Sequence, residues 1–327
     1  MRAIVLKKPG GVDNLILKDV ESPKKMSKND IVIKHTFVGV NFDDILVRRG
    51  SIEMPKLESN PHNCLGLDGV GMIERVGSAI TRFKVGQRVG YAFAPIGSYC
   101  ERRVINANFC IAIPDDITDE IACAILRKGL AAHTMLFRCN VPKKGHTILV
   151  TGAGSGVGHI IARWAKYSEL KVIGLIGNEK KRESATLTGC DLVLNYNDKD
   201  AFEKIADFTK QNGVHSVYDS IGEDVFDLCI KSLHVFGTYV SYGNTSGNIN
   251  AFDPLVLQGK SLFFTKPRFE LYKSNRNELI ISVHELFDAY KRGAVAINSV
   301  KYTFNTIPNA HKAIESKEIT GSVVAML

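Results

Sequence analysis

The chain has 327 residues, of which 45% are hydrophobic and 23% charged, and its formal net charge is +8. This composition excludes a disordered chain, and no apolar run reaches the roughly 20 residues that a membrane-spanning helix needs. The basic residues are scattered doublets without an aromatic ladder, so a dedicated nucleic-acid surface is not expected.

The first 120 or so residues are predicted to be rich in short strands. The predicted strands are residues 3–6, 15–20, 30–40, 71–77, 87–93 and 102–113. Gly, Pro, Asn and Asp residues separate them, as is typical of a β-rich, barrel-like domain.

From about residue 122 to 265, predicted strands alternate with predicted helices. The strands are 147–152, 171–177, 192–196, 216–222 and 237–243, and the helices are 156–169, 179–189, 201–211 and 224–236. Repeated strand–helix units predict a parallel, doubly wound sheet. The last 60 or so residues are expected to form helices 276–293 and 309–318 and a final strand, 321–327.

The turn after residue 151 has four glycines in seven residues, 152–158. The spacing is not a strict G-x-G-x-x-G, because what stands is Ala153-x-x-Gly156-x-Gly158. Bare backbone between a strand and a helix lets a pyrophosphate approach closely, and the positive end of the helix dipole attracts it. The turn therefore predicts dinucleotide binding.

The end of the next strand indicates which dinucleotide is bound. An acidic residue there would hydrogen-bond the 2′-hydroxyl of NADH, but residues 174–178 are small or neutral. Lys180, Lys181 and Arg182 follow, and their charge suits a 2′-phosphate. NADPH is therefore expected. The alternative interpretation is a solvated helix start with Glu179 as a partner of the helix dipole.

The chain resembles a known family over essentially its whole length. The stretches VGVNFDDILVRRG, GLDGVGMIERVGS, LRKGLAAHTML, TGAGSGVG, LNYNDKD, VYDSIGEDVFD and VSYGNTSG occur in the order seen in zinc-independent quinone oxidoreductases. These enzymes belong to the medium-chain dehydrogenase/reductase superfamily. The resemblance implies an α/β fold with a GroES-like β-rich domain, residues 1–121 and 266–327, a Rossmann domain with a doubly wound parallel sheet, residues 122–265, and a cofactor in the cleft.

The resemblance also implies which residues hold the cofactor. The glycine-rich turn would face the pyrophosphate with Ala153, Ser155, Gly156, Val157 and Gly158. The 2′-phosphate end would be held by Gly177, Lys181, Tyr196 and Lys317. The ends of later strands would add Ser220, Tyr242, Gly243 and Asn244. The alternative for Tyr196 is a half-buried strand residue.

Three residues are candidates for the reaction itself. By resemblance, Asn41 would lie near the nicotinamide and Lys128 near its ribose, while Asp44 is a possible proton donor. The alternative for Asn41 is a turn residue that caps the helix of residues 42–50. The chain also departs from the family pattern, because it has Leu46 and Ile52 where tyrosines are common, Ala131 for a threonine and Asp68 for a glutamate.

No metal is expected. Where zinc enzymes of the superfamily carry Gly-His-Glu, this chain has Gly66-Leu67-Asp68, and no cysteine cluster follows. His62 and Cys64 lie close together, but two ligands do not complete a tetrahedral site.

The expected reaction is hydride transfer from NADPH to a quinone or a similar electron-poor acceptor, with the proton supplied by water. One alternative is reduction of the C=C bond of an enal, an enone or an enoyl thioester. Another is a non-enzymatic protein that binds NADPH or RNA.

Seven cysteines without a CxxC pair indicate reduced thiols, and the start of the chain does not resemble a signal peptide, so a cytoplasmic protein is expected. Residues 261–266 are a predicted edge strand. The resemblance implies that such strands pair across a two-fold axis, which predicts a homodimer.

Overall fold

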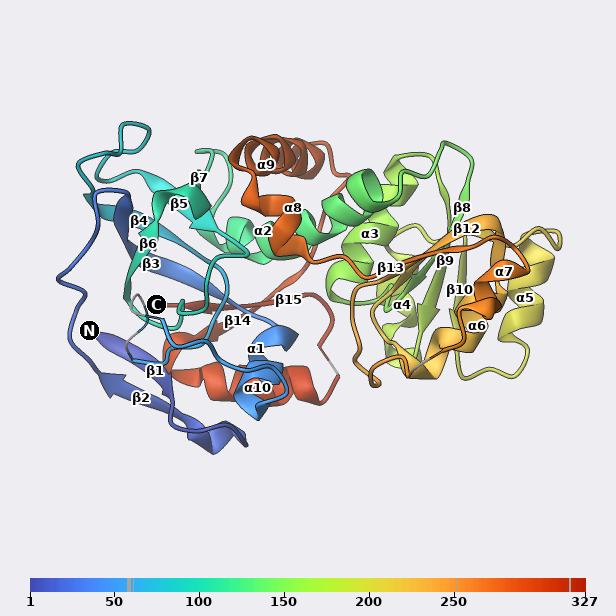
Figure 1. Cartoon of the computed structure of the whole chain (residues 1–327), viewed down its shortest axis with the longest axis horizontal. Helices are drawn as coiled ribbons and strands as arrows, with labels where there is room; N and C mark the ends of the chain where they lie inside the picture. Colours follow the sequence, from blue (N-terminus) through green and yellow to red (C-terminus); the bar gives the residue numbers. More distant parts are fainter. Residues whose placement is uncertain (58–59, 61, 251, 318) are drawn as a thin grey trace. The chain divides into compact units, whose positions relative to one another are not determined.

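The computed structural model describes the chain except residues 58, 59, 61, 251 and 318 (Figure 1). It divides into two compact units. Unit 1 comprises residues 1–127, 273–283 and 298–327, and unit 2 comprises residues 128–272 and 284–297. The domain boundaries expected after residues 121 and 265 were drawn from the sequence pattern and stay predictions.

Unit 1 is built on antiparallel strands. A two-stranded sheet pairs β1 with β2, and a larger sheet has the order β14-β15-β3-β4-β5-β7, with β6 paired to β3. The strands are β1 Arg2–Leu6, β2 Leu15–Asp19, β3 Asp30–Val40, β4 Gly69–Val76, β5 Arg88–Tyr91, β6 Arg102–Asn106, β7 Cys110–Ala112, β14 Ser299–Thr303 and β15 Ser322–Met326. Only β14 and β15 run parallel to each other in the larger sheet. The predicted β-rich first domain is thus confirmed.

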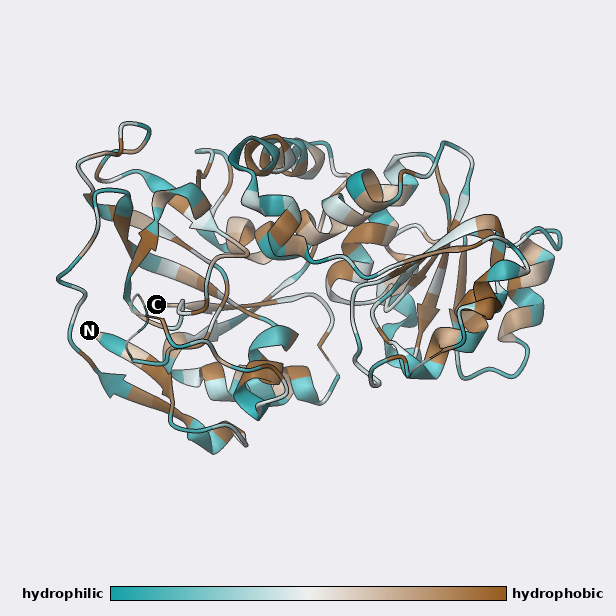
Figure 2. Ribbon diagram, in the orientation of Figure 1, coloured by the Kyte–Doolittle hydropathy of each residue, from teal (hydrophilic) through white to brown (hydrophobic). Residues whose placement is uncertain are grey.

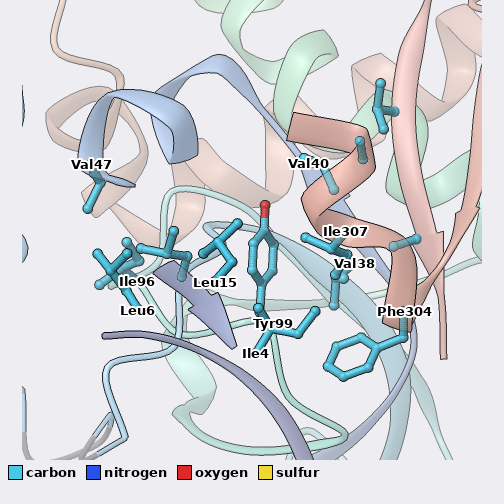
Figure 3. Close-up of a cluster of buried hydrophobic side chains, with 14 residues drawn as sticks. Ile4, Leu6, Leu15, Val38, Val40, Val47, Ile96, Tyr99, Phe304 and Ile307 are labelled. Carbon is cyan, nitrogen blue, oxygen red and sulfur yellow. The ribbon is translucent and has the colours of Figure 1, made fainter. Parts of the chain in front are cut away.

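One core of unit 1 surrounds Tyr99, which is fully buried. Figure 3 shows its ring between Leu15 and Ile96 on one side and Val38 and Ile307 on the other. These side chains come from both ends of the sequence, so the last segment of the chain completes a core that the first segment begins.

Unit 2 contains a parallel sheet in the order β10-β9-β8-β11-β12-β13. Its strands are β8 Thr147–Thr151, β9 Lys171–Ile176, β10 Leu192–Asn195, β11 Val214–Asp219, β12 Leu233–Ser241 and β13 Phe263–Thr265. Counted along the chain, this is the 3-2-1-4-5-6 order of a Rossmann sheet. The central strands β8 and β9 are buried on both faces apart from Lys171. Figure 2 shows the hydrophobic residues of this sheet in brown.

Helices connect the strands and cover the sheets. They are α1 Phe42–Arg49, α2 Asp119–Thr134, α3 Gly156–Tyr167, α4 Arg182–Thr186, α5 Ala201–Phe208, α6 Phe226–Lys231, α7 Leu255–Gln258, α8 Phe269–Ser274, α9 Arg276–Lys291 and α10 Ile307–Glu315. A π-helix, Met135–Cys139, follows α2. Single 3-10 turns lie at Val12–Asn14, Ala107–Phe109, Glu179–Lys181, Glu223–Val225 and Phe304–Thr306.

Two predicted elements differ from the structure. The strand expected over residues 102–113 is divided into β6 and β7 by the 3-10 turn Ala107–Phe109. The helix expected over residues 224–236 stops at Lys231, and Leu233 already belongs to β12. β12 pairs with β11 at Leu233, and the register then shifts before Thr238. Phe236 has a left-handed φ of 62° at this irregularity, and its N–H bonds the Lys260 carbonyl at 2.8 Å. An irregular segment of β12 therefore replaces the last expected helical turn.

Candidate functional site

The glycine-rich turn joins β8 to α3 at the carboxyl edge of the sheet in unit 2. Gly152 and Gly156 have φ of 64° and 54°, a conformation that favours glycine. A Cβ on Gly158 would collide with the Gly152 carbonyl oxygen, so this glycine lets α3 pack directly on the strand end. A Cβ on Gly156 would meet nothing within 4 Å. The backbone at Gly156, the first residue of α3, thus borders open space on the side where a Cβ would project.

The first backbone N–H groups of a helix have no partner within the helix. Those of α3 belong to Gly156, Val157 and Gly158, and Ser155 precedes them as the N-cap. Ala153 is buried, and its N–H bonds the Leu175 carbonyl at 3.3 Å, which anchors the turn to β9. The predicted residues of the turn therefore lie at a helix start, where an anion is attracted. Their contact with a pyrophosphate stays a prediction.

Lys181 lies beside this turn. Its Nζ donates to the Ser155 Oγ at 3.4 Å, and a Cβ on Gly154 would lie 2.6 Å from the Lys181 carbonyl oxygen. The Ser184 Oγ donates to the Gly154 carbonyl at 2.9 Å and holds the two segments together. Lys181 thus brings a positive charge to the open start of α3.

Arg182, whose charge was expected to suit a 2′-phosphate, makes contacts within unit 2. Its Nε lies 2.6 Å from the Glu179 carboxylate, and its Nη1 donates to the Val193 carbonyl at 2.7 Å. These bonds fasten the start of α4 to β10. The expected part of Arg182 in a phosphate pocket with Lys181 stays a prediction.

Tyr196 and Gly177 meet at the ends of β10 and β9. A Cβ on Gly177 would lie 2.5 Å from the Tyr196 hydroxyl, so glycine gives the tyrosine room. The side chain is half-buried, as the alternative interpretation states, and this burial raises its pKa. The residue is neutral near neutral pH and presents a hydroxyl at the strand ends.

Asp219, which the sequence analysis did not select, organises the ends of β8, β11 and β12. Its buried carboxylate accepts from the Thr151 Oγ1 at 2.9 Å, the Tyr239 hydroxyl at 2.9 Å, and the N–H groups of Ile221 and Gly222 at 2.9 and 3.0 Å. Burial raises its pKa, although these bonds favour the charged form. The sequence could have indicated Asp219 by its position at the end of a predicted strand, next to Ser220.

The remaining predicted residues of the later strands lie around Asp219. The Ser220 N–H donates to the Thr151 Oγ1 at 2.8 Å, and the Tyr242 N–H donates to the Asp219 carbonyl at 2.7 Å. A Cβ on Gly243 would lie 2.6 Å from the Ser220 carbonyl oxygen, so the two strand ends approach closely there. Asn244 donates to the Asn248 Oδ1 at 2.6 Å.

Two predicted cofactor residues lie elsewhere in the chain. Lys128, in α2, is half-buried and is the first residue of unit 2. Lys317 is exposed, follows α10 in unit 1 and has a φ of 59°. Their expected contacts with the ribose and the 2′-phosphate stay predictions.

In unit 1, Asn41 is the N-cap of α1, as its alternative interpretation states. Its N–H donates to the Asp44 Oδ2 at 2.8 Å, and its Nδ2 donates to the Asp68 Oδ1 at 2.6 Å. Asp68 is buried, and a Cβ on Gly39 would collide with its carboxylate. The Asn41 amide is therefore held in one orientation, and its expected contact with the nicotinamide stays a prediction.

Asp44 lies in the interior of unit 1. Besides the Asn41 N–H, its Oδ2 accepts from the Tyr99 hydroxyl at 3.2 Å, and this hydroxyl lies 3.1 Å from the His311 Nε2. Burial raises the pKa of Asp44 to about 7, and burial lowers the pKa of His311 to about 3. The carboxylate has no exposed surface, and its role as a proton donor stays a prediction.

Besides Asp68, three residues depart from the family pattern, and all three are apolar. Leu46 is half-buried in α1, Ala131 is buried in α2, and Ile52 is 44% exposed. None of the three side chains has a hydroxyl to offer a substrate.

Within the described residues, no group of three or more His, Cys, Asp or Glu side chains has an arrangement that could hold a metal ion. Leu67 has no ligating atom, and the neighbouring Asp68 is bonded to Asn41. Among the helices that the structure describes, none has the length and apolar character needed to cross a membrane.

Comparison with protein families gives two matches. Residues 27–137 match the alcohol dehydrogenase GroES-like domain, and residues 156–270 match the zinc-binding dehydrogenase family. The matches bear out the expected pair of a GroES-like and a Rossmann domain. The donor set of this chain does not fit the zinc ion in the second description, because the ligands for one are not assembled in the described residues.

Individual relatives match the whole chain. A 2-haloacrylate reductase from a Burkholderia species is 34% identical and covers 99% of this chain and 98% of its own. Quinone oxidoreductase 1 of Escherichia coli is 32% identical and covers 96% of each chain. The crystal structure of an Escherichia coli quinone oxidoreductase in complex with NADPH has a TM-score of 0.94, 31% identity and full coverage of both chains.

Proposed function

We propose a function from the family: the chain belongs to the quinone oxidoreductase family of the medium-chain dehydrogenase/reductase superfamily. It transfers a hydride from NADPH to a quinone or to another electron-poor acceptor. The relatives named as quinone oxidoreductases, and the Escherichia coli structure solved with NADPH, support this activity and this cofactor.

The observation that carries the proposal is the open start of α3 with Lys181 beside it. The first N–H groups of a helix and its dipole attract a pyrophosphate, and the Lys181 ammonium lies 3.4 Å from the Ser155 hydroxyl at the same turn. An acidic side chain that would repel a 2′-phosphate is absent from residues 174–178. Tyr196, above Gly177, adds a neutral hydroxyl.

Each part of the chain has a separate task in this proposal. Gly156, Val157 and Gly158 bind the pyrophosphate, and Lys181 and Tyr196 bind the 2′-phosphate. Asp219 keeps the strand ends at a fixed spacing through its bonds to Thr151 and Tyr239. When bound, NADPH supplies the hydride from its nicotinamide.

For the reaction itself, the proposed function depends on the positioning of the reacting groups. Asn41 orients the reacting groups with an amide that Asp68 holds in place, and Lys128 contacts the ribose. A quinone accepts the hydride readily and takes its proton from water, so alignment supplies most of the rate; good alignment contributes roughly 7–11 kcal/mol. No general acid of the chain is needed for a quinone.

The test follows the absorbance of NADPH in the presence of quinones, enals, enones and enoyl thioesters, with NADH as the comparison cofactor. Lys181→Glu should lower the ratio of kcat/KM for NADPH over NADH by about 10- to 100-fold, because a hydrogen bond to a charged group is worth ~1.5–3 kcal/mol. Lys231→Glu makes the same charge change at the exposed end of α6 and should leave the ratio unchanged. An unchanged ratio in Lys181→Glu would mean that the phosphate binds elsewhere.

A second candidate is reduction of an activated C=C bond. The observation that favours it is the 2-haloacrylate reductase, whose name describes such a substrate and which covers 98% of its own length in the match. Turnover of 2-haloacrylate or an enone, without turnover of any quinone, would select this reaction. Absence of turnover with every acceptor, together with RNA binding that falls steeply with salt, would select the non-enzymatic alternative.

We also propose that the chain forms a homodimer through the edge of the sheet in unit 2. The position of β13 at the end of the strand order supports this. We also keep the cytoplasmic location, supported by seven cysteines, all described and all free thiols, since a reducing compartment maintains thiols.

A further inference from the structure

Cys64 and Cys100 form a pair of buried thiols in unit 1 that the proposed reaction does not use. Cys64 is paired with Val5 and Cys100 with Ala3, each through an isolated antiparallel bridge to β1. Both side chains pack with Ala3 and Val5 in one small apolar cluster. The two cysteines, far apart in sequence, therefore lie side by side against the same strand.

The geometry of this pairing suits a covalent bond. Ala3 and Val5 are two positions apart on one strand, so their partners are separated by about 6.6 Å at a rise of ~3.3 Å per residue, and both partners project to the same face. Disulfides form between Cα atoms roughly 4.4–6.8 Å apart. The Cys100 thiol donates to the Gly97 and Arg102 carbonyl oxygens at 3.4 and 3.2 Å, which holds its side chain in this cluster.

We infer that Cys64 and Cys100 are an oxidisable dithiol, which hydrogen peroxide converts to a disulfide. The Cys64 thiolate attacks one peroxide oxygen, which gives a sulfenic acid and releases water after protonation. The Cys100 sulfur then attacks the Cys64 sulfur and displaces a second water. Two thiols and one peroxide yield one disulfide and two waters. A dithiol reductant restores the two thiols by thiol–disulfide exchange and becomes a disulfide itself.

Neighbouring groups change the pKa values of the two thiols in opposite directions, so each cysteine has its own step in the oxidation. Interaction with the Cys100 thiol lowers the pKa of Cys64, and the charge of the nearby Arg103 acts in the same direction, against burial. Interaction with the Cys64 thiol and burial raise the pKa of Cys100. Cys64 is thus the first nucleophile and Cys100 the resolving thiol. Their exposures of 3% and 4% favour a small oxidant over a bulky disulfide reagent.

The bond would link two segments that support the candidate site. Cys64 precedes the Leu65–Asp68 segment, and Asp68 holds the Asn41 amide. Cys100 follows Tyr99, whose hydroxyl donates to Asp44. Oxidation would therefore fix the supports of Asn41 and Asp44 to each other. This consequence rests on the proposed function, whereas formation of the disulfide does not.

The experiment treats the reduced full-length chain with hydrogen peroxide, blocks the remaining thiols, digests without reduction and maps the peptides by mass spectrometry. The expected product is a peptide with Cys64 joined to a peptide with Cys100, lost on treatment with dithiothreitol. Oxidised protein should also show a higher Tm, since the bond restricts the unfolded chain. NADPH oxidation is measured in parallel.

Cys64→Ala and Cys100→Ala should each abolish the linked peptide and the Tm increase. Cys110→Ala, a matched change at another buried thiol of unit 1, should leave both intact. Recovery of Cys64 and Cys100 as free thiols in wild type, while the half-buried Cys139 is oxidised, would overturn the proposal, as would separate sulfinic acids without a link. A linked peptide with unchanged NADPH oxidation would retain the site and exclude its influence on the reaction.

Discussion

Asp44 and His311 both contact the Tyr99 hydroxyl from the interior of unit 1, and their pKa values move in opposite directions. The pKa of Asp44 is about 7 in the folded chain and 3.8 ordinarily, so the folded state binds the proton more tightly. Its contribution to the free energy of unfolding is present at low pH and is lost as pH rises from about 4 to 7. His311, with a pKa of about 3 instead of 6.5, binds its proton more tightly in the unfolded state.

The His311 contribution is present above pH 6.5 and is lost as pH falls toward 3. Between about pH 4 and 6.5, Asp44 makes the free energy of unfolding fall with pH, and His311 makes it rise. Asp44→Asn should make the free energy of unfolding rise with pH in this window, whereas His311→Gln should make it fall. Each slope is at most about 1.4 kcal/mol per pH unit, the value for one proton.

Urea unfolding at a series of pH values checks the prediction. The wild type should show a flatter profile than either variant, because its two terms cancel in part. Asparagine still offers an oxygen to the Asn41 N–H and the Tyr99 hydroxyl, so Asp44→Asn removes the titration and keeps an acceptor. Identical slopes in the wild type and both variants would show that neither residue titrates as described.

At the scale of elements, the sequence pattern predicts the alternating part of unit 2 well. The helix expected at 156–169 is α3, Gly156–Tyr167, and the strand expected at 147–152 is β8, Thr147–Thr151. Both have a clear apolar run or an apolar face bounded by turn residues. α2 was not predicted, because most of its residues are buried and it lacks the polar face that gives a helix its period.

The sequence predicts the part of the candidate site that depends on backbone conformation. Glycines with positive φ are required at Gly152 and Gly156, and the pattern indicates them directly. Asp219 and the bonds of Arg182 depend on partners from other strands, such as Tyr239 and Val193, and no local pattern reveals those. Tertiary contacts therefore give neighbouring residues different positions: Lys181 lies beside the glycine-rich turn, and Arg182 joins α4 to β10.

Gly158 tests the packing of α3 on β8. Gly158→Ala would place a methyl group against the Gly152 carbonyl oxygen, so the helix start must shift. Overpacking of this kind costs about 1–3 kcal/mol, which exceeds the gain in helix propensity. The free energy of unfolding from urea titration should fall by this amount, and the affinity for NADPH from calorimetry should fall as well.

Gly259→Ala is the matched control for this substitution. Gly259 has a φ of −59°, and a Cβ there would meet nothing within 4 Å. The change should leave NADPH affinity unaltered and raise the free energy of unfolding by ~0.4–1 kcal/mol through the unfolded state. Equal effects of the two substitutions on NADPH affinity would contradict the role of the close approach at Gly158.

At the scale of the whole molecule, β13 is the last strand in the order of the unit 2 sheet, and its free side is a surface that proteins usually cover. Phe263 on this strand is 60% exposed. Two copies that pair these edges across a two-fold axis would continue the sheet and cover both phenylalanines. The expected assembly is a dimer of two 36.0 kDa chains.

Equilibrium sedimentation at micromolar concentration checks the dimer. Phe263→Lys should shift the equilibrium to the 36.0 kDa monomer, since a charge on an edge strand opposes pairing. Leu187→Lys, which changes another exposed apolar side chain of unit 2, should leave the dimer intact because Leu187 follows α4 and is not on β13. A wild-type particle of 36.0 kDa would remove the dimer, and a dimer that Phe263→Lys does not weaken would move its interface to another surface.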